Sequence, residues 1–196
     1  MNLLFNEPLI AGLEYRDRFI GEPEERALLD QLTALDLAPF RFHGWLGNRK
    51  TKSFGWRYDF DDASFAPTDA IPVWLAPLRD RAAEFAGLAP DGIHHALIAR
   101  YDPGAGIGWH KDRDLFDKVV GVSLNTPAIL RFRRRSAGAF ERASLEVEPR
   151  SAYLLSGEVR REWEHRILPG EQLRFSITFR TLSDKGRRIA EAQRIS

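Results

Sequence analysis

The sequence predicts an α+β domain in which two helices precede a β-sandwich or jelly-roll core. Two observations support this fold class. In two charged segments ahead of His95, apolar residues recur at helical spacing. From His95 onward the chain changes to short runs of β-branched and aromatic residues separated by turn-forming residues. Two helices followed by seven or eight short strands is the order expected for this class.

The two helical segments are expected at Pro23 to Leu37 and roughly at Pro72 to Leu88. In the first segment, alanine and leucines stand among charged residues at spacings close to those of an amphipathic helix. In the second, a broad apolar face follows Pro72, which suits the first turn of a helix, and Gly87 and Pro90 help to end it.

The expected strands are short and follow one another closely. They are Ala96–Tyr101, Val119–Leu124, Ala128–Arg133, Ser144–Glu148, Ala152–Leu155, Glu164–Leu168 and Arg174–Leu182. The charged tail 183–196 is expected to be solvated surface, with a helix as its regular structure. Because no internal repeat, linker or low-complexity tract interrupts the chain, a single domain is predicted.

Composition limits the chemistry that the chain can perform. The chain has no cysteine, so thiolate nucleophiles, thiolate metal sites and disulfides are excluded, and any metal must be held by His, Asp or Glu. The net charge of +1 falls short of a dedicated nucleic-acid-binding domain, so a nucleic acid would have to be attracted by a local patch. Because the sequence shows neither a leader nor an apolar span, we expect a cytoplasmic monomer without membrane contact.

The sharpest motif is a histidine and an aspartate two positions apart, His110 and Asp112, after a Gly-rich turn. In extended chain, residues two apart point to the same side, so both side chains can reach one metal ion. A His-x-Asp tripeptide also arises by chance. His165 offers a third ligand, because it shares its side of a later strand with Trp163 and Ile167 and is therefore turned inward. Two imidazoles and one carboxylate form a facial triad that leaves positions open for substrate and oxygen.

The last predicted strand presents one polar and one apolar face. Its even positions are Arg174, Ser176, Thr178 and Arg180, and its odd positions are Phe175, Ile177 and Phe179. An amphipathic strand at the surface would show the same alternation. However, the strand begins nine positions after His165, and a guanidinium is suited to gripping a carboxylate with two parallel hydrogen bonds. A dicarboxylate that also binds iron would need that grip.

His-x-Asp, a distant His and Arg-x5-Arg, in this order, resemble the signature of the AlkB-type 2-oxoglutarate- and iron(II)-dependent oxygenases. The resemblance covers about Ile93 to Leu182 and includes the runs 100–104 and 156–158. It implies a double-stranded β-helix (jelly-roll) core with flanking N-terminal helices. The helices and a nucleotide-recognition lid would occupy about 1–92, the catalytic jelly roll about 93–182, and the charged tail 183–196.

The resemblance also implies the roles of individual residues. The implied ligands of Fe(II) are His110, Asp112 and His165. The implied residues for 2-oxoglutarate are Tyr101, Arg174, Ser176, Thr178 and Arg180. Arg174 would pair with the far carboxylate, supported by the Tyr101 hydroxyl, and Arg180 would lie near the other end or brace Asp112. Ala99 stands where related proteins often have Asn, so a hydrogen bond to the cosubstrate is lost or replaced there.

Enzymes of this family consume 2-oxoglutarate and O2 and release succinate and CO2, and a methyl group on a base nitrogen leaves as formaldehyde. The resemblance therefore implies removal of alkyl groups from DNA or RNA, with single strands or damaged duplexes favoured because unstacking costs least there. The same chemistry on a protein side chain or a small molecule is the second hypothesis. A non-catalytic barrel that binds metal or nucleic acid is the third, and it would not need Arg174 and Arg180 as a paired anchor.

Residues 42–58 mix aromatic and basic side chains, and this stretch resembles the family's lid in position. Trp45, Trp56 and Tyr58 are the rings predicted to stack a base, although such rings could equally cover the open end of the barrel. Asp114 matches an acidic position that faces the target base in the family, but it could also be an exposed turn carboxylate. The basic run 131–135 could add phosphate contacts, although charge runs are usually solvated faces.

Overall fold

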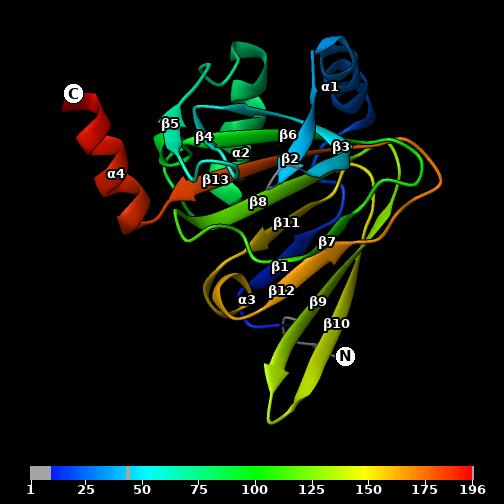
Figure 1. The fold of residues 1–196 in the computed structure, drawn as a ribbon. Helices are drawn as coiled ribbons and strands as arrows, with labels where there is room; N and C mark the ends of the chain where they lie inside the picture. The colour runs from blue at the N-terminus through cyan, green and yellow to red at the C-terminus, as the bar shows by residue number, and fades with distance from the viewer. Residues whose placement is uncertain (1–9, 43–44, 196) are drawn as a thin grey trace, which may run out of the picture.

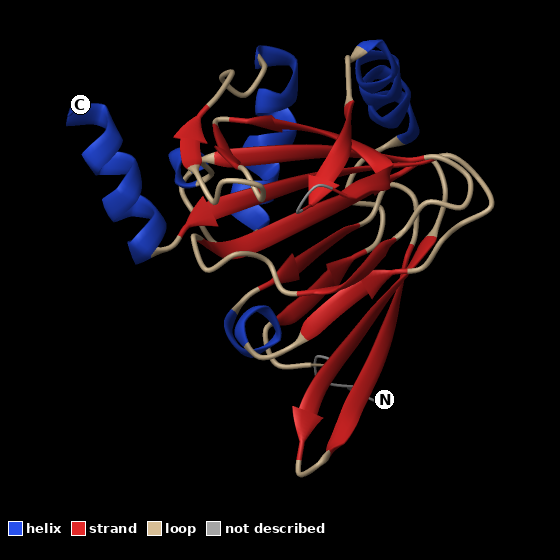
Figure 2. Cartoon of the chain, in the orientation of Figure 1, coloured by secondary structure: helices blue, strands red, loops and turns tan. Residues whose placement is uncertain are grey.

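The structure is a computed structural model that describes residues 10–42 and 45–195, with the side chains of 41–47, 194 and 195 outside the description. Two antiparallel sheets face each other (Figures 1 and 2). The larger sheet has the order β1 (Leu13–Arg16), β11 (Ala152–Leu155), β8 (Phe116–Leu124), β13 (Arg174–Leu182), β6 (His95–Tyr101), β3 (Trp45–Phe54) and β2 (Ala38–Phe42). The smaller sheet has the order β10 (Ala139–Val147), β9 (Ala128–Ser136), β12 (Glu164–Ile167) and β7 (Ile107–His110). This is the predicted α+β class with a jelly-roll core.

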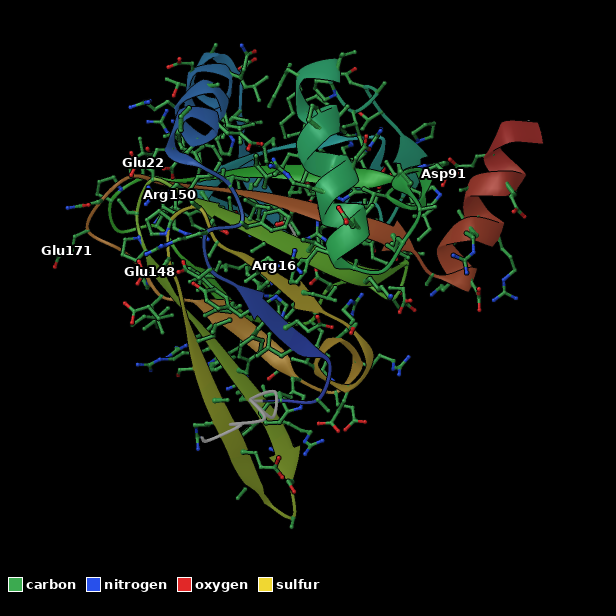
Figure 3. The ribbon with its side chains drawn as sticks, turned by 180° about the vertical axis from the view of Figure 1, so that it is seen from behind. Arg16, Glu22, Asp91, Glu148, Arg150 and Glu171 are labelled. Atoms are coloured by element: carbon green, nitrogen blue, oxygen red, sulfur yellow. The ribbon has the colours of Figure 1, made fainter. Side chains whose placement is uncertain are left out.

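Two hydrophobic cores lie on the two sides of the larger sheet. The inner core, between the sheets, joins residues such as Leu155 of the larger sheet to Phe132 of the smaller one. The outer core packs helices α1 (Glu22–Ala34) and α2 (Ala76–Phe85) against the sheet, with the 3-10 turn Val73–Leu75 leading into α2. Figure 3 shows both helices from behind, across the outside of the larger sheet.

Helix α1 is anchored to two loops of the barrel through one buried carboxylate. Glu25 is only 7% exposed, accepts a hydrogen bond from the backbone N–H of Asn125, and pairs with Arg150 at 3.0 Å. Arg150 also approaches Glu22 at 4.0 Å, and Figure 3 shows these two residues where α1 meets the loops. Both helices begin with a proline in the first turn, and α1 carries three glutamates there, which favours the positive end of the helix dipole.

Strand β13 lies in the middle of the larger sheet and pairs with both β6 and β8. Its odd residues Phe175, Ile177 and Phe179 enter the outer core, and each is at most 1% exposed. Its even residues therefore face the smaller sheet. Both faces of the strand are buried, which rules out the alternative of an amphipathic surface strand.

The strand predictions from β6 onward hold to within a few residues, with one exception. Strands β9 and β10 form a long hairpin that projects from the body (Figure 1), whereas the sequence indicated strands only at 128–133 and 144–148. Ion pairs extend the hairpin, because Arg134 bonds Glu141 across the strands at 2.8 Å. In the sequence the arginines of 131–135 look like a solvated run, but in the structure Arg133 and Arg134 pair with glutamates of neighbouring strands, while Arg131 and Arg135 are exposed.

Helix α4 (Asp184–Ile195) confirms the regular structure expected of the tail, but the tail is not all solvated surface. Ala190 is 5% exposed and packs with Leu182 and with Phe65 of the small ribbon formed by β4 (Trp56–Tyr58) and β5 (Phe65–Pro67). The remaining short helices are the 3-10 turn Pro90–Gly92 and α3 (Gly157–Arg161). Across the described ranges, no helix has the length and apolar character needed to cross a membrane.

Candidate active site

The two predicted histidine ligands lie opposite each other in the smaller sheet. His110 ends β7 and His165 lies on β12, and the two are register partners with ring centroids 4.3 Å apart. Asp112 follows two residues beyond β7, and its Oδ2 lies 3.7 Å from His165 Nε2. All three side chains line one cavity between the sheets. The structure thus brings together the three residues selected from the sequence.

The ionisation states of these groups suit metal binding. Burial lowers the pKa of His165 to about 3, aided by neighbouring His110, so that imidazole is neutral. Burial also lowers the pKa of His110, and its Nδ1 donates to the Gly108 carbonyl at 2.8 Å, which leaves the Nε2 lone pair free. Burial opposes ionisation of Asp112, but the Arg180 guanidinium beside it outweighs burial and holds the pKa of that carboxyl far below its usual range.

Arg180 fixes the Asp112 carboxylate from the larger sheet. Its Nη2 and Nε donate to the same oxygen of Asp112, Oδ1, at 2.8 and 3.2 Å. His95 lies behind it, 3% exposed, with Nδ1 3.4 Å from Arg180 Nη1 and its ring against Phe116. Burial and Arg180 hold the pKa of His95 well below its ordinary value, so this ring is neutral and can accept from the guanidinium. Sequence reasoning missed His95, because no motif surrounds it.

A second arginine, Arg174, lies at the other end of β13, and no acidic residue in the described part of the chain pairs with it. Arg174 is 4% exposed, and its Nε and Nη2 donate to the Ser123 hydroxyl at 3.2 and 3.1 Å. Its Nη1 is buried and makes no hydrogen bond in the structure. The guanidinium lies 5.1 Å from the centre of the Tyr101 ring. A buried cation with a free donor is costly unless an anion arrives to satisfy it.

The cavity wall between the two arginines is polar, as the alternation of β13 predicted. Ser176 and Thr178 line it, and the Tyr101 hydroxyl is within hydrogen-bonding reach of Ser176 and Arg49. Burial alone would raise the pKa of Tyr101, but Arg49 and Arg174 lower it below its ordinary value. Arg49, on β3 and 8% exposed, is a cavity residue that sequence reasoning placed only in the general basic stretch of the lid.

The residues present fit both groups that the chemistry needs. Among the described residues, no three His, Asp or Glu side chains already stand at the spacing of a metal-holding group. Two neutral imidazoles and one ionised carboxylate are nevertheless the donor set of a non-haem Fe(II) site. The unsatisfied Nη1 of Arg174 is an observation that calls for a carboxylate, and 2-oxoglutarate supplies one.

The four residues predicted to meet the substrate are placed differently from one another. Trp56 is 6% exposed and stacks on Phe65 at 4.9 Å, so it is a packing residue here and not an open platform. The Asp114 carboxylate pairs with Lys185 of α4 at 2.7 Å and is thus engaged outside the cavity. The side chain of Trp45 lies outside the described residues. Tyr58 is half-buried beneath the Arg113 guanidinium, 4.4 Å from its ring centre.

Tyr58 belongs to an aromatic and arginine cluster, defined as Phe40, Arg49, Tyr58, Phe60 and Arg113. The Phe60 ring lies 4.9 Å from Tyr58 and 5.4 Å from Phe40, and the guanidinium of Arg49 lies 4.0 Å above Phe40. Arg113 adjoins Asp112 in the chain, and Arg49 lines the metal cavity, so the cluster borders the site at both ends. In the sequence its members are scattered over four segments, and only their folding together reveals it.

Comparisons with known proteins agree with this geometry. Residues 33–180 match the model of the 2OG-Fe(II) oxygenase superfamily. The dioxygenase AlkB of Salmonella typhimurium is 30% identical over 208 residues, which cover 92% of this chain and 95% of that protein. AlkB of Escherichia coli is 31% identical over 150 residues, covering 65% and 68%. An Arabidopsis thaliana protein named alkylated DNA repair protein ALKBH8 homolog is 25% identical over 193 residues, and the chain spans about half of it, 54%.

Solved structures show the same fold. The structure titled OsALKBH1 superposes with a TM-score of 0.71 at 14% identity, covering 89% of this chain and 99% of that one. A prolyl-4-hydroxylase from Pseudomonas putida gives a TM-score of 0.59 at 19% identity, covering 88% and 93%. Given the family match over most of the chain, this protein belongs to the AlkB-like 2OG-Fe(II) oxygenases and is a dioxygenase that uses Fe(II), 2-oxoglutarate and O2.

Proposed function

We propose that this dioxygenase removes alkyl groups, methyl above all, from the bases of nucleic acid. When bound, Fe(II) and 2-oxoglutarate supply the oxidation of a C–H bond by O2, with succinate, CO2 and formaldehyde as the products besides the restored base. His110, Asp112 and His165 hold the metal in this proposal. Arg174 holds the far carboxylate of the cosubstrate, and Arg180 keeps Asp112 ionised and oriented.

The observation that carries the proposal is the aromatic and arginine cluster beside the metal ligands. A planar base can stack on the rings of Tyr58 and Phe60, and the guanidinium of Arg113 next to them can contact a phosphate or a base face. A site for an aliphatic side chain or a small acid has no need of edge-to-face rings interleaved with arginines. The cluster lies between Arg49 in the cavity and Arg113 after Asp112, so a base stacked on it would lie close to the metal.

The names of the relatives and the surface of the hairpin support the same substrate class. A Danio rerio protein named probable RNA/DNA demethylase ALKBH6 is 28% identical over 149 residues. On the hairpin, Arg131 and Arg135 are exposed, whereas Arg133 and Arg134 between them are paired with glutamates. The exposed pair can contact phosphates, and phosphate contacts supply sequence-independent affinity.

The test begins with the cofactors and proceeds to the substrate. The purified protein is loaded anaerobically with Fe(II) and 2-oxoglutarate, and the metal-to-ligand charge-transfer band is recorded in the visible. A methylated single-stranded DNA or RNA oligonucleotide and O2 are then added, and succinate, formaldehyde and base methylation are assayed. The band and methyl loss are both expected for the wild type, and Asp112→Ala should lose both.

Two variants separate the substrate proposal from the cofactor chemistry. Tyr58→Ala should keep the charge-transfer band but demethylate the oligonucleotide more slowly, whereas Tyr15→Ala, a change of an exposed ring on β1, should behave as wild type in both assays. If the band forms and no oligonucleotide loses its methyl group, the substrate is a protein side chain or a small molecule. If no band forms, the metal assignment is wrong.

A further inference from the structure

The inner wall of the cavity contains a tyrosine that no sequence motif selected. Tyr153 lies on β11, 6% exposed, and lines the cavity together with the three metal-ligand candidates. Its register partner on β8 is Gly121, and Gly121 in turn pairs with Thr178 on β13. Strand β8 therefore lies between Tyr153 and the polar face of β13. A side chain on β8 at the position of Gly121 would keep the Tyr153 ring from reaching that face.

Gly121 is what lets the ring reach across. A Cβ at this position would lie 2.2 Å from the Tyr153 Cζ and 2.4 Å from its hydroxyl oxygen, so the hydroxyl end of the ring lies directly on the backbone of β8. Any side chain at Gly121 would push the ring away. Gly121 thus leaves the space in which the Tyr153 phenol extends from β11 toward the centre of the larger sheet.

The Tyr153 phenol lies close to ionic groups there. Burial raises the pKa of Tyr153 to about 12, and the groups close enough to act on it include Arg174, Tyr101, Asp112 and Arg180. The hydroxyl is therefore neutral and able to donate at physiological pH. Tyr153 lines the cavity that holds the metal-ligand candidates, so its hydroxyl can donate to an oxygen atom of a ligand bound there.

The cavity wall beside the polar face of β13 includes a residue without a side-chain donor. Ala99 lines the same cavity and pairs with Ser176 on β13. We propose that the Tyr153 hydroxyl is a further cosubstrate-positioning group, which donates a hydrogen bond to a carboxylate oxygen of 2-oxoglutarate at this wall. The proposal concerns the cosubstrate and does not depend on whether the substrate is nucleic acid.

The experiment measures cosubstrate affinity directly. 2-Oxoglutarate is titrated anaerobically into the Fe(II) protein, with the charge-transfer band as the signal, and into the Mn(II) protein by calorimetry. Tyr153→Phe keeps the ring and removes only the hydroxyl. Because a hydrogen bond to a charged group is lost, its Kd for 2-oxoglutarate should rise about 10- to 100-fold. Tyr15→Phe removes a hydroxyl on β1 that accepts a hydrogen bond from the backbone N–H of Glu148 and does not line the cavity; it serves as the control, with an unchanged Kd.

Two further readouts separate positioning from a merely structural role. Mn(II) affinity without 2-oxoglutarate should be the same in Tyr153→Phe and the wild type, because the hydroxyl is assigned to the cosubstrate. Gly121→Ala keeps the hydroxyl but displaces the ring, and should weaken 2-oxoglutarate binding as Tyr153→Phe does. If Gly121→Ala does not fold, Tyr153→Phe alone decides. An unchanged Kd in Tyr153→Phe, or an equal loss of Mn(II) and 2-oxoglutarate affinity, overturns the proposal.

Discussion

Arg174 should stabilise the bound cosubstrate far more than it stabilises the empty fold. Arg174 is 4% exposed, and within the described chain its guanidinium donates to the Ser123 hydroxyl and pairs with no acid. Two hydrogen bonds to one neutral hydroxyl return about 1 to 2 kcal/mol, whereas burying an unpaired charge costs several kcal/mol. The empty protein therefore carries Arg174 at a net cost, which a bound carboxylate offsets.

The perturbation that isolates this balance is the double variant Ser123→Ala, Arg174→Met. Methionine keeps an unbranched apolar stem of similar reach, and removing both partners leaves no orphaned hydroxyl. The free energy of unfolding without cosubstrate should be unchanged or higher by on the order of 1 to 3 kcal/mol. The Kd for 2-oxoglutarate should rise about 100-fold or more, because a paired, charge-assisted contact is lost.

Urea denaturation of the metal-free protein measures the first quantity, and the anaerobic charge-transfer titration measures the second. As an independent check, 2-oxoglutarate at 100 times the wild-type Kd should raise the free energy of unfolding of the metal-loaded wild type by about 2.7 kcal/mol. The same concentration should leave the free energy of unfolding of the double variant unchanged. Ser123→Ala alone should retain most cosubstrate affinity. A double variant that is less stable than the wild type by more than about 2 kcal/mol, yet still binds 2-oxoglutarate normally, would show that Arg174 is a structural anchor.

Three smaller predictions test other parts of the site. Trp56→Ala should cost about 3 to 5 kcal/mol of unfolding free energy in urea melts, whereas Tyr58→Ala should cost about 1 kcal/mol and instead weaken oligonucleotide binding measured by anisotropy. Asp114→Ala should change the free energy of unfolding by less than about 1 kcal/mol, since its ion-pair partner Lys185 is 55% exposed. Turnover should be unchanged. A large fall in turnover would show that Asp114 does contact the target base. Because the folded pKa of Tyr153, about 12, exceeds the unfolded value near 10, its stabilising contribution is full below pH 10 and is lost between pH 10 and 12. Over that window the wild type should lose stability relative to Tyr153→Phe, and parallel curves would argue against a buried phenol.

The catalytic half of the molecule could be predicted because its signals are local. Alternation along Arg174–Leu182 identified both the strand and its polar face, and the inward side of β12 was readable from Trp163, His165 and Ile167. Each of these inferences needs only the period of two along a strand. The N-terminal strands β1 to β5 have no such clear alternation, and β1 and β3 pair with β11 and β6, which lie far along the chain, so the sequence predicted only a lid there.

The residues that sequence reasoning missed act through neighbours from other strands. His95 becomes relevant only because β6 pairs with β13 so that it lies beside Arg180. Trp56 is a residue type that can stack on a base, but α4 and β5 cover the region around it. No local sequence pattern predicts that it is buried. Asp114 likewise turns toward Lys185 because α4 packs nearby. Such contacts depend on long-range packing, which periodicity does not encode.

The position of β13 explains how one strand can serve both the fold and the chemistry. Its apolar face is sealed by the helices, so its polar face can be fully removed from water without exposing the sheet. Exclusion of water from this face strengthens each charged contact, so Asp112 stays ionised beside Arg180. For the same reason, the unsatisfied guanidinium of Arg174 favours binding of an anion. Loosening the outer core, for example by Ile177→Ala, should therefore weaken 2-oxoglutarate binding as well as stability, although Ile177 faces away from the cavity. The site and the outer core are coupled because they share a single strand.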